Sequence, residues 1–74
     1  MKIFRFYKNQ SGQMTIGEVQ VVPGNRRISC ANQLSEARKT NQEHVVKVNQ
    51  YLAYVVAEST YAAVHLFDQS GHEA

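Results

Sequence analysis

The chain has 74 residues, a formal net charge of +2 and 43% hydrophobic residues, a composition that is ordinary for a globular domain. This length has room for one domain, which we place over residues 1–74 with a frayed tail from about Ser70. The single cysteine, Cys30, excludes an internal disulfide and a zinc site built on two or four cysteines.

Two β-strands joined by a short loop are predicted at the start of the chain. Over residues 2–8 the side chains alternate, which places Phe4 and Phe6 together on one face of a strand. The polar, glycine-containing segment 9–13 has the length of a hairpin loop. A second strand is therefore expected at 14–22, directly after this loop.

Two glycines mark local features of the following segment. Gly17 lies where the apolar residues of the second strand change parity, a pattern that predicts a β-bulge. The Pro-Gly pair in the middle of residues 22–25 is typical of a type II turn. A short third strand is expected after this turn at 26–30, with Ile28 and Cys30 facing the core.

A long helix is predicted over residues 33–57. Apolar residues recur at intervals of three and four from Leu34 to Val55, which is the spacing of one helix face. From Val45 onward the segment is apolar on nearly all sides and rich in β-branched residues, which also suit a strand. The unbroken helical spacing favours the helix.

The last element, over 60–67, fits either a strand or a helix. As a helix it would begin at a Ser59 or Thr60 cap and end near Gly71. The strand is favoured, because it would complete a sheet that one helix can cover. The predicted fold class is α+β: a small antiparallel sheet, made of three N-terminal strands and a C-terminal strand, packed on one long helix. The alternative is a ββαα order, with the last element helical.

The sequence shows neither the pattern of a membrane-spanning helix nor that of a signal peptide. The longest apolar run, 51–57, is far shorter than the roughly 18 residues that a membrane-spanning helix needs. Arg5 interrupts the apolar residues of segment 1–8, so this segment does not resemble a signal peptide. Together with the lone Cys30, these observations predict a cytoplasmic protein that does not enter a membrane.

The residue types that support catalysis or metal binding do not occur in the required patterns. Cys30 is not embedded in a catalytic signature. His44, His65 and His72 lie too far apart in sequence to form a helical metal-binding pair. The glycine-rich motifs that bind nucleotides are also missing. We therefore expect a protein that is not an enzyme, with no catalytic residue, no metal site and no cofactor.

A protein-protein interface is the first functional expectation. The predicted helix has more apolar surface than one sheet can cover, and tyrosine is enriched at interfaces. The residues expected at this interface are Val46, Tyr51, Tyr54 and Val55. This pattern predicts a small protein-binding or adaptor protein without enzymatic activity, which self-associates as a homodimer and binds a protein partner that the sequence does not identify.

Nucleic-acid binding is the alternative expectation. Basic residues outnumber acidic residues over 1–30, whereas 31–74 is mildly acidic. A sheet face that combines arginine with an aromatic residue can bind phosphates and stack bases. The candidate residues for this anion-binding or nucleic-acid-binding surface are Lys2, Arg5, Tyr7, Lys8, Arg26 and Arg27.

Overall fold

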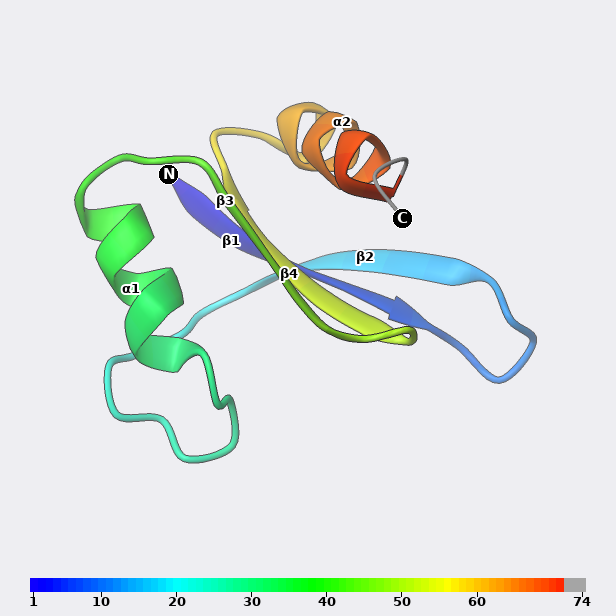
Figure 1. The fold of residues 1–74 in the computed structure, drawn as a ribbon, viewed down its shortest axis with the longest axis horizontal. Coiled ribbons are helices and arrows are strands. Elements are labelled where there is room, and N and C mark those ends of the chain that lie inside the picture. Colours follow the sequence, from blue (N-terminus) through cyan, green and yellow to red (C-terminus); the bar gives the residue numbers. More distant parts are fainter. Residues whose placement is uncertain (72–74) are drawn as a thin grey trace.

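A computed structural model describes residues 1–71 as one four-stranded antiparallel sheet with a helix on each face (Figure 1). The elements are, in chain order, β1 (Lys2–Lys8), β2 (Met14–Val19), α1 (Ala31–Lys39), β3 (His44–Asn49), β4 (Leu52–Ala57) and α2 (Thr60–Gly71). The strands lie in the order β2-β1-β4-β3, so β2 and β3 form the two edges. The predicted α+β class with an antiparallel sheet is confirmed, but the expected set of elements is partly wrong.

The N-terminal hairpin is confirmed, but its second strand ends at Val19 and not at residue 22 as predicted. Strand β1 has the expected bounds, and β2 pairs with it in an unbroken register from Lys8 and Met14 to Ile3 and Val19. The β-bulge expected at Gly17 is therefore wrong. The apolar residues of β2 change parity because the sheet buries side chains on both of its faces.

The predicted third strand at 26–30 is absent, because this segment is a series of turns. The type II turn over 22–25 is confirmed, since Gly24 has a φ of 81° and the Asn25 N–H donates to the Val22 carbonyl (3.2 Å). Cys30 is buried, and Ile28 packs against the core on the α1 side of the sheet. Their inward orientation was predicted, although their backbone is not a strand.

Helix α1 ends at Lys39, so the long helix predicted over 33–57 is wrong. Asn41 has a φ of 59°, a left-handed conformation that asparagine tolerates after the last helical residue. The Gln42 N–H donates to the Ala37 carbonyl (2.9 Å) and the Asn41 N–H donates to the Arg38 carbonyl (3.2 Å). These are the two hydrogen bonds of a Schellman motif, which stops the helix and reverses the chain.

Strands β3 and β4 take the place of the remaining predicted helix. Strand β4 lies inside the sheet between β1 and β3, with α1 over one of its faces and α2 over the other. A strand that is buried on both faces has a nearly continuous apolar sequence. This is why the segment looks like a helix that is apolar on all sides.

The residues predicted to form a protein interface are thus placed on strands β3 and β4 and in the turn between them, rather than on a helix. Tyr54 is 6% exposed and Val55 is fully buried, because both lie on the central strand β4. Val46 is half-buried, and Tyr51 is 57% exposed in the turn between β3 and β4. The surplus helical surface on which the interface rested does not exist. Whether the chain self-associates stays a prediction.

The last element is a helix, so the strand favoured for 60–67 is wrong and the helical alternative is right about this element. The Ser59 hydroxyl caps the helix by accepting from the Ala62 N–H (3.1 Å). A C-terminal strand is not needed, because the β3–β4 hairpin completes the sheet. Ser70, where the frayed tail was expected to begin, belongs to α2, and residues 72–74 lie outside the described residues. Neither helix within 1–71 is long and apolar enough to cross a membrane.

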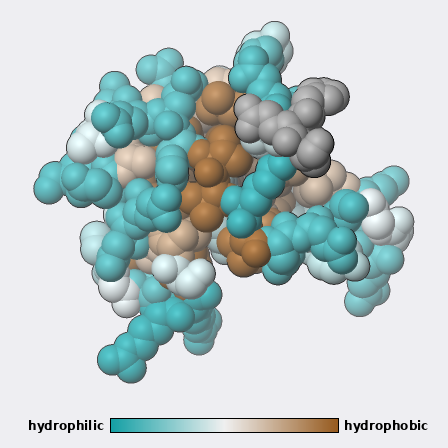
Figure 2. Space-filling model, in the orientation of Figure 1, coloured by the Kyte–Doolittle hydropathy of each residue, from teal (hydrophilic) through white to brown (hydrophobic). Residues whose placement is uncertain are grey.

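Two hydrophobic clusters hold the helices on the sheet. On the α1 side, Leu34 packs in a cluster with Ile3 and Val56, and on the α2 side Phe4 and Phe6 lie in a cluster below α2. Hydrophobic side chains gather in the middle of the view, where the sheet lies between the helices, and hydrophilic side chains surround them (Figure 2). The two helices therefore leave different parts of the sheet uncovered on its two sides.

Candidate functional site

Helix α1 covers only one end of its side of the sheet. It lies where β1 begins and β4 ends, and the β1–β2 hairpin extends away from it (Figure 1). Further along β1 on the same side, Arg5 is exposed and Tyr7 is half-buried. We call this uncovered part of the sheet the open face. Its residues are Arg5, Tyr7, Thr15, Gly17 and Leu52, which are neighbours in the strand register.

Arg5 and Tyr7 form the distinctive contact of the open face. They are two residues apart on β1, so strand alternation places both side chains on the same side of the sheet. The Arg5 Cζ atom lies 4.5 Å from the centroid of the Tyr7 ring, which is a cation–π contact. At an exposed site such a contact contributes about 0.5–1 kcal/mol. It holds the guanidinium on the sheet surface rather than free in solvent.

Gly17 leaves the surface next to Arg5 without a side chain. It pairs with Arg5 across the β1–β2 ladder. A Cβ atom built at Gly17 would meet no other atom of residues 1–71 within 4 Å, apart from those of its chain neighbours. The backbone of β2 is therefore accessible beside the guanidinium, and a flat group could lie against it.

The charge of the open face is positive. The strand residues on the α1 side include Arg5 and His44 but no carboxylate within the described chain. Glu18 lies on the opposite side of the sheet, where its carboxylate is 4.0 Å from the Lys2 ammonium. An anion approaching the α1 side thus meets the Arg5 guanidinium with no acidic strand residue beside it.

Two further arginines lie on the α1 side of the sheet. Arg26 and Arg27 are exposed in the loop between β2 and α1, whose apolar residue Ile28 packs against the α1-side cluster. Side-chain oxygens hold the shape of this loop. The Asn32 Oδ1 atom accepts from the Gly24 N–H (2.8 Å), and the Asn25 Oδ1 atom accepts from the Arg27 N–H (2.9 Å). The two guanidinium groups are therefore carried by an anchored loop.

The structure separates the residues predicted as a nucleic-acid-binding surface into two groups. Arg5 and Tyr7 are in contact, and Arg26 and Arg27 lie on the same side of the sheet. Lys2 and Lys8 are on β1 as predicted, but they alternate with Arg5 and Tyr7 and lie on the α2 side. These two lysines do not belong to the open face.

Thr15 and Gly17 were missed in the sequence, although a signal for them exists. The 9–13 loop sets the hairpin register, in which Lys8 pairs with Met14. Counting along the two strands from this pair places Gly17 opposite Arg5 and Thr15 opposite Tyr7. The hairpin prediction therefore contained the open-face residues of β1 and β2, but not Leu52 of β4.

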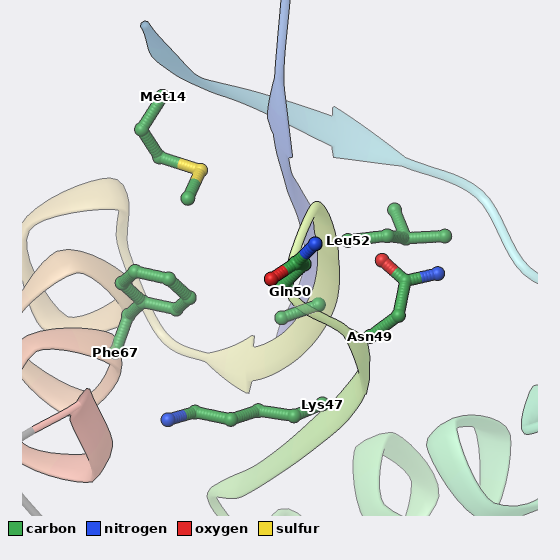
Figure 3. Close-up of a pocket in the computed structure, with 7 residues that line it drawn as sticks. Met14, Lys47, Asn49, Gln50, Leu52 and Phe67 are labelled. Atoms are coloured by element: carbon green, nitrogen blue, oxygen red, sulfur yellow. The ribbon is translucent and has the colours of Figure 1, made fainter. Parts of the chain in front are cut away.

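A small cavity lies on the other side of the sheet, at the end of α2. Figure 3 shows Phe67 from α2 and Met14 from β2 beside it, with Lys47 extending along its lower side. The cavity has a volume of about 120 Å³. Small-molecule sites usually have about 300–1,000 Å³. The Lys47 ammonium also donates to the Ser70 carbonyl (2.9 Å), so it is already engaged in holding α2.

Metal-binding and nucleophilic groups do not assemble within the part of the chain that the structure describes. Residues 1–71 contain no group of three histidine, cysteine or acidic side chains that could hold a metal ion. Cys30 is buried, and desolvation raises the pKa of its thiol. The thiol thus stays protonated at neutral pH, in a form that is a poor nucleophile.

This burial predicts slow chemical labelling of Cys30. In the native protein at pH 8, a thiol reagent is expected to react at least about tenfold more slowly than after unfolding in urea, because only the exposed thiolate reacts. Mass spectrometry of timed samples measures the difference. Equal rates in the native and unfolded states would contradict the burial of Cys30.

Comparisons with known proteins do not identify the chain. No model of a protein family, no curated protein and no solved structure matches it.

Proposed function

We propose that the open face binds single-stranded nucleic acid. The observation that carries this proposal is the exposed Arg5 guanidinium, held over the Tyr7 ring on a part of the sheet that no helix covers. Arginine and aromatic side chains on a sheet are a recurrent platform for unpaired bases, because every base has a π face that stacks. The lack of carboxylates among the α1-side strand residues within 1–71 supports an anionic ligand.

The proposed binding mode assigns different roles to the residues. A base stacks on the Arg5–Tyr7 pair, and the open surface at Gly17 accommodates the edge of that base against the β2 backbone. Arg26 and Arg27 contact phosphates, for which the forked guanidinium is suited. Unpaired bases fit this role better than a duplex, whose bases are stacked inside the double helix.

The proposal replaces the adaptor function that was expected first. That expectation depended on a helix with two apolar faces, and the residues on which it rested now form the core strand β4 and its neighbours. The role we propose is binding without catalysis. A protein interface requires a different surface, which is considered below.

Arg5→Ala is expected to weaken binding of a single-stranded 12-mer by at least about fivefold, because stacking of one base contributes about 1–3 kcal/mol. Lys8→Ala is the matched control. It removes the same charge from the same strand but from the α2 side, and it should change the affinity by less than about twofold. Fluorescence anisotropy of labelled DNA and RNA at several salt concentrations measures both variants.

The salt dependence tests the phosphate contacts separately. Each contact with a single strand contributes about −0.7 to the slope of log K against log salt concentration. The double variant Arg26→Ala/Arg27→Ala is therefore expected to reduce the slope by about 1.4, since two contacts are lost. Equal losses in Arg5→Ala and Lys8→Ala, or no binding by the unaltered protein at low salt, would refute the proposal.

A further inference from the structure

Strand β2 is an unprotected edge of the sheet. Its sequence, Met14–Val19, contains one charged residue, Glu18, and neither lysine nor proline. Its pairing with β1 runs without a bulge. Natural edge strands usually carry such features, which prevent the free backbone N–H and C=O groups from pairing with another chain. The outer side of β2 can therefore accept a further strand.

The opposite edge strand, β3, is better protected against pairing with another chain. Strand β3 carries Lys47, and its pairing with β4 is irregular between Lys47 and Asn49. A charged residue and an irregular register both disfavour pairing with an incoming strand. Any extension of the sheet should thus occur at β2.

Apolar side chains lie beside β2 on the α2 side of the sheet. Met14 is 42% exposed and Val64 of α2 is 38% exposed, with the half-buried Ile16 and Phe67 in the groove between them. This groove has a volume of about 310 Å³. A strand added to β2 would cover the groove with its side chains on this side of the sheet. The occupant therefore needs apolar residues on the face that lies on the α2 side of the sheet.

Strand β2 itself meets this requirement. Two of its three α2-side residues, Met14 and Ile16, are apolar and the third is Glu18, whereas its α1-side residues Thr15 and Gly17 are small. We propose that two copies of the chain pair antiparallel through β2, with Ile16 opposite Ile16 of the second copy. This register brings the apolar side chains of the two β2 strands together on the α2 side of the sheet. It also places Glu18 opposite Met14, so that the two Glu18 carboxylates do not face each other across the ladder.

The dimer would extend the open face across the two-fold axis. Antiparallel pairing keeps equivalent faces on the same side, so both copies present Arg5 and Tyr7 on one surface of an eight-stranded sheet. In this register Gly17 lies opposite Thr15 of the second copy. Four residues then form one row across the strands: Arg5 and Gly17 of one copy, followed by Thr15 and Tyr7 of the second copy. The row crosses three strand spacings and is about 14 Å long. Each stacking platform is thus completed by residues of the other copy.

Cysteine cross-linking tests the pairing and its register. In a Cys30→Ala background, Ile16→Cys is expected to give a disulfide-linked dimer under mild oxidation, because opposed residues have Cα atoms about 4.5–5.5 Å apart, within disulfide range. Glu18→Cys is the matched control on the same strand. Its two copies would lie four strand positions apart, roughly 13 Å, and should not cross-link. Non-reducing electrophoresis measures the yield of dimer.

Light scattering coupled to size exclusion, without nucleic acid, measures the mass of the unaltered chain. About twice 8.4 kDa at micromolar concentration is expected. A mass of 8.4 kDa at every concentration would overturn the dimer, and cross-linking at Glu18→Cys but not at Ile16→Cys would overturn its register. Both measurements are made without nucleic acid, so they test the pairing separately from the proposed function. A dimer that does not bind nucleic acid would refute only the proposed function. A monomer that binds nucleic acid would refute only the pairing.

Discussion

Tyr54→Lys is expected to abolish the folded state. Tyr54 lies on the central strand β4, is 6% exposed and packs in the cluster that also contains Ile3 and Val56. A lysine ammonium at this position would be buried without an acidic partner, because the described chain has no buried polar or charged residue. Burial of an unpaired charge costs several kcal/mol, a large part of the about 5–15 kcal/mol by which domains are stable.

Far-UV circular dichroism and a urea titration measure this effect, with Tyr51→Lys as the control. Tyr51 is 57% exposed in the β3–β4 turn, so its replacement is expected to shift stability by less than about 0.5 kcal/mol. Comparison of the Tyr54→Lys and Tyr51→Lys variants also distinguishes the two interpretations of the segment 33–57, one long helix or α1 followed by strands β3 and β4. A folded, monomeric Tyr54→Lys protein would favour the long helix and its dimer interface over the strands.

Phe6→Ala is expected to lower the free energy of unfolding by about 3–5 kcal/mol, the usual effect of removing a buried phenylalanine. Phe6 is 3% exposed, and its ring stacks on that of Phe67 with the centroids 4.4 Å apart and the planes at 2°. The side chain therefore joins β1 to α2 across the α2-side cluster. Its loss leaves a cavity and frees α2 from the sheet.

Equilibrium unfolding in urea measures the loss, because stability falls linearly with denaturant and the midpoint shifts in proportion. Phe6→Leu retains most of the apolar volume and is expected to lose less than Phe6→Ala. Phe67→Ala, at the half-buried partner, should also cost less. If Phe6→Ala left the midpoint unchanged, the packing of α2 on this part of the sheet would be incorrect.

The features that depend on local sequence could be predicted. Alternating side chains, a five-residue polar loop and a Pro-Gly turn gave the β1–β2 hairpin and the turn over 22–25. Each of these signals is complete within a few residues. The N-terminal cap at Ser59 is also a local signal, but it was considered only with the helical alternative for 60–67, and the strand was favoured there.

The β3–β4 hairpin could not be predicted in this way, because its evidence is distributed over the whole fold. Strand β4 is apolar throughout only because a helix lies on each side of it, and the packing of either helix on the sheet is a property of the tertiary fold. Periodicity alone does not distinguish a strand buried on both sides from a buried helix. The stop signal at Asn41 was available, but asparagine is a weaker marker of a helix end than glycine.

About half of the candidate site followed from the sequence. Strand alternation placed Arg5 and Tyr7 on one face, and the same alternation excludes Lys2 and Lys8 from it. The exposure of that face could not be deduced, because it depends on where α1 ends. In the structure α1 covers the end of the sheet where β1 begins, and it leaves Arg5 exposed and Tyr7 half-buried.

The pairing of β1 with β4 has a consequence for how the chain folds. These strands are about 50 residues apart in sequence, and such long-range contacts slow folding because a large loop must close first. Both hydrophobic clusters include residues of β4, so neither is complete before this strand joins β1. During synthesis, the N-terminal hairpin and α1 have no finished core to pack on. Cooperative folding has to wait until the chain has been made at least as far as Ala57, and the α2-side cluster also needs α2.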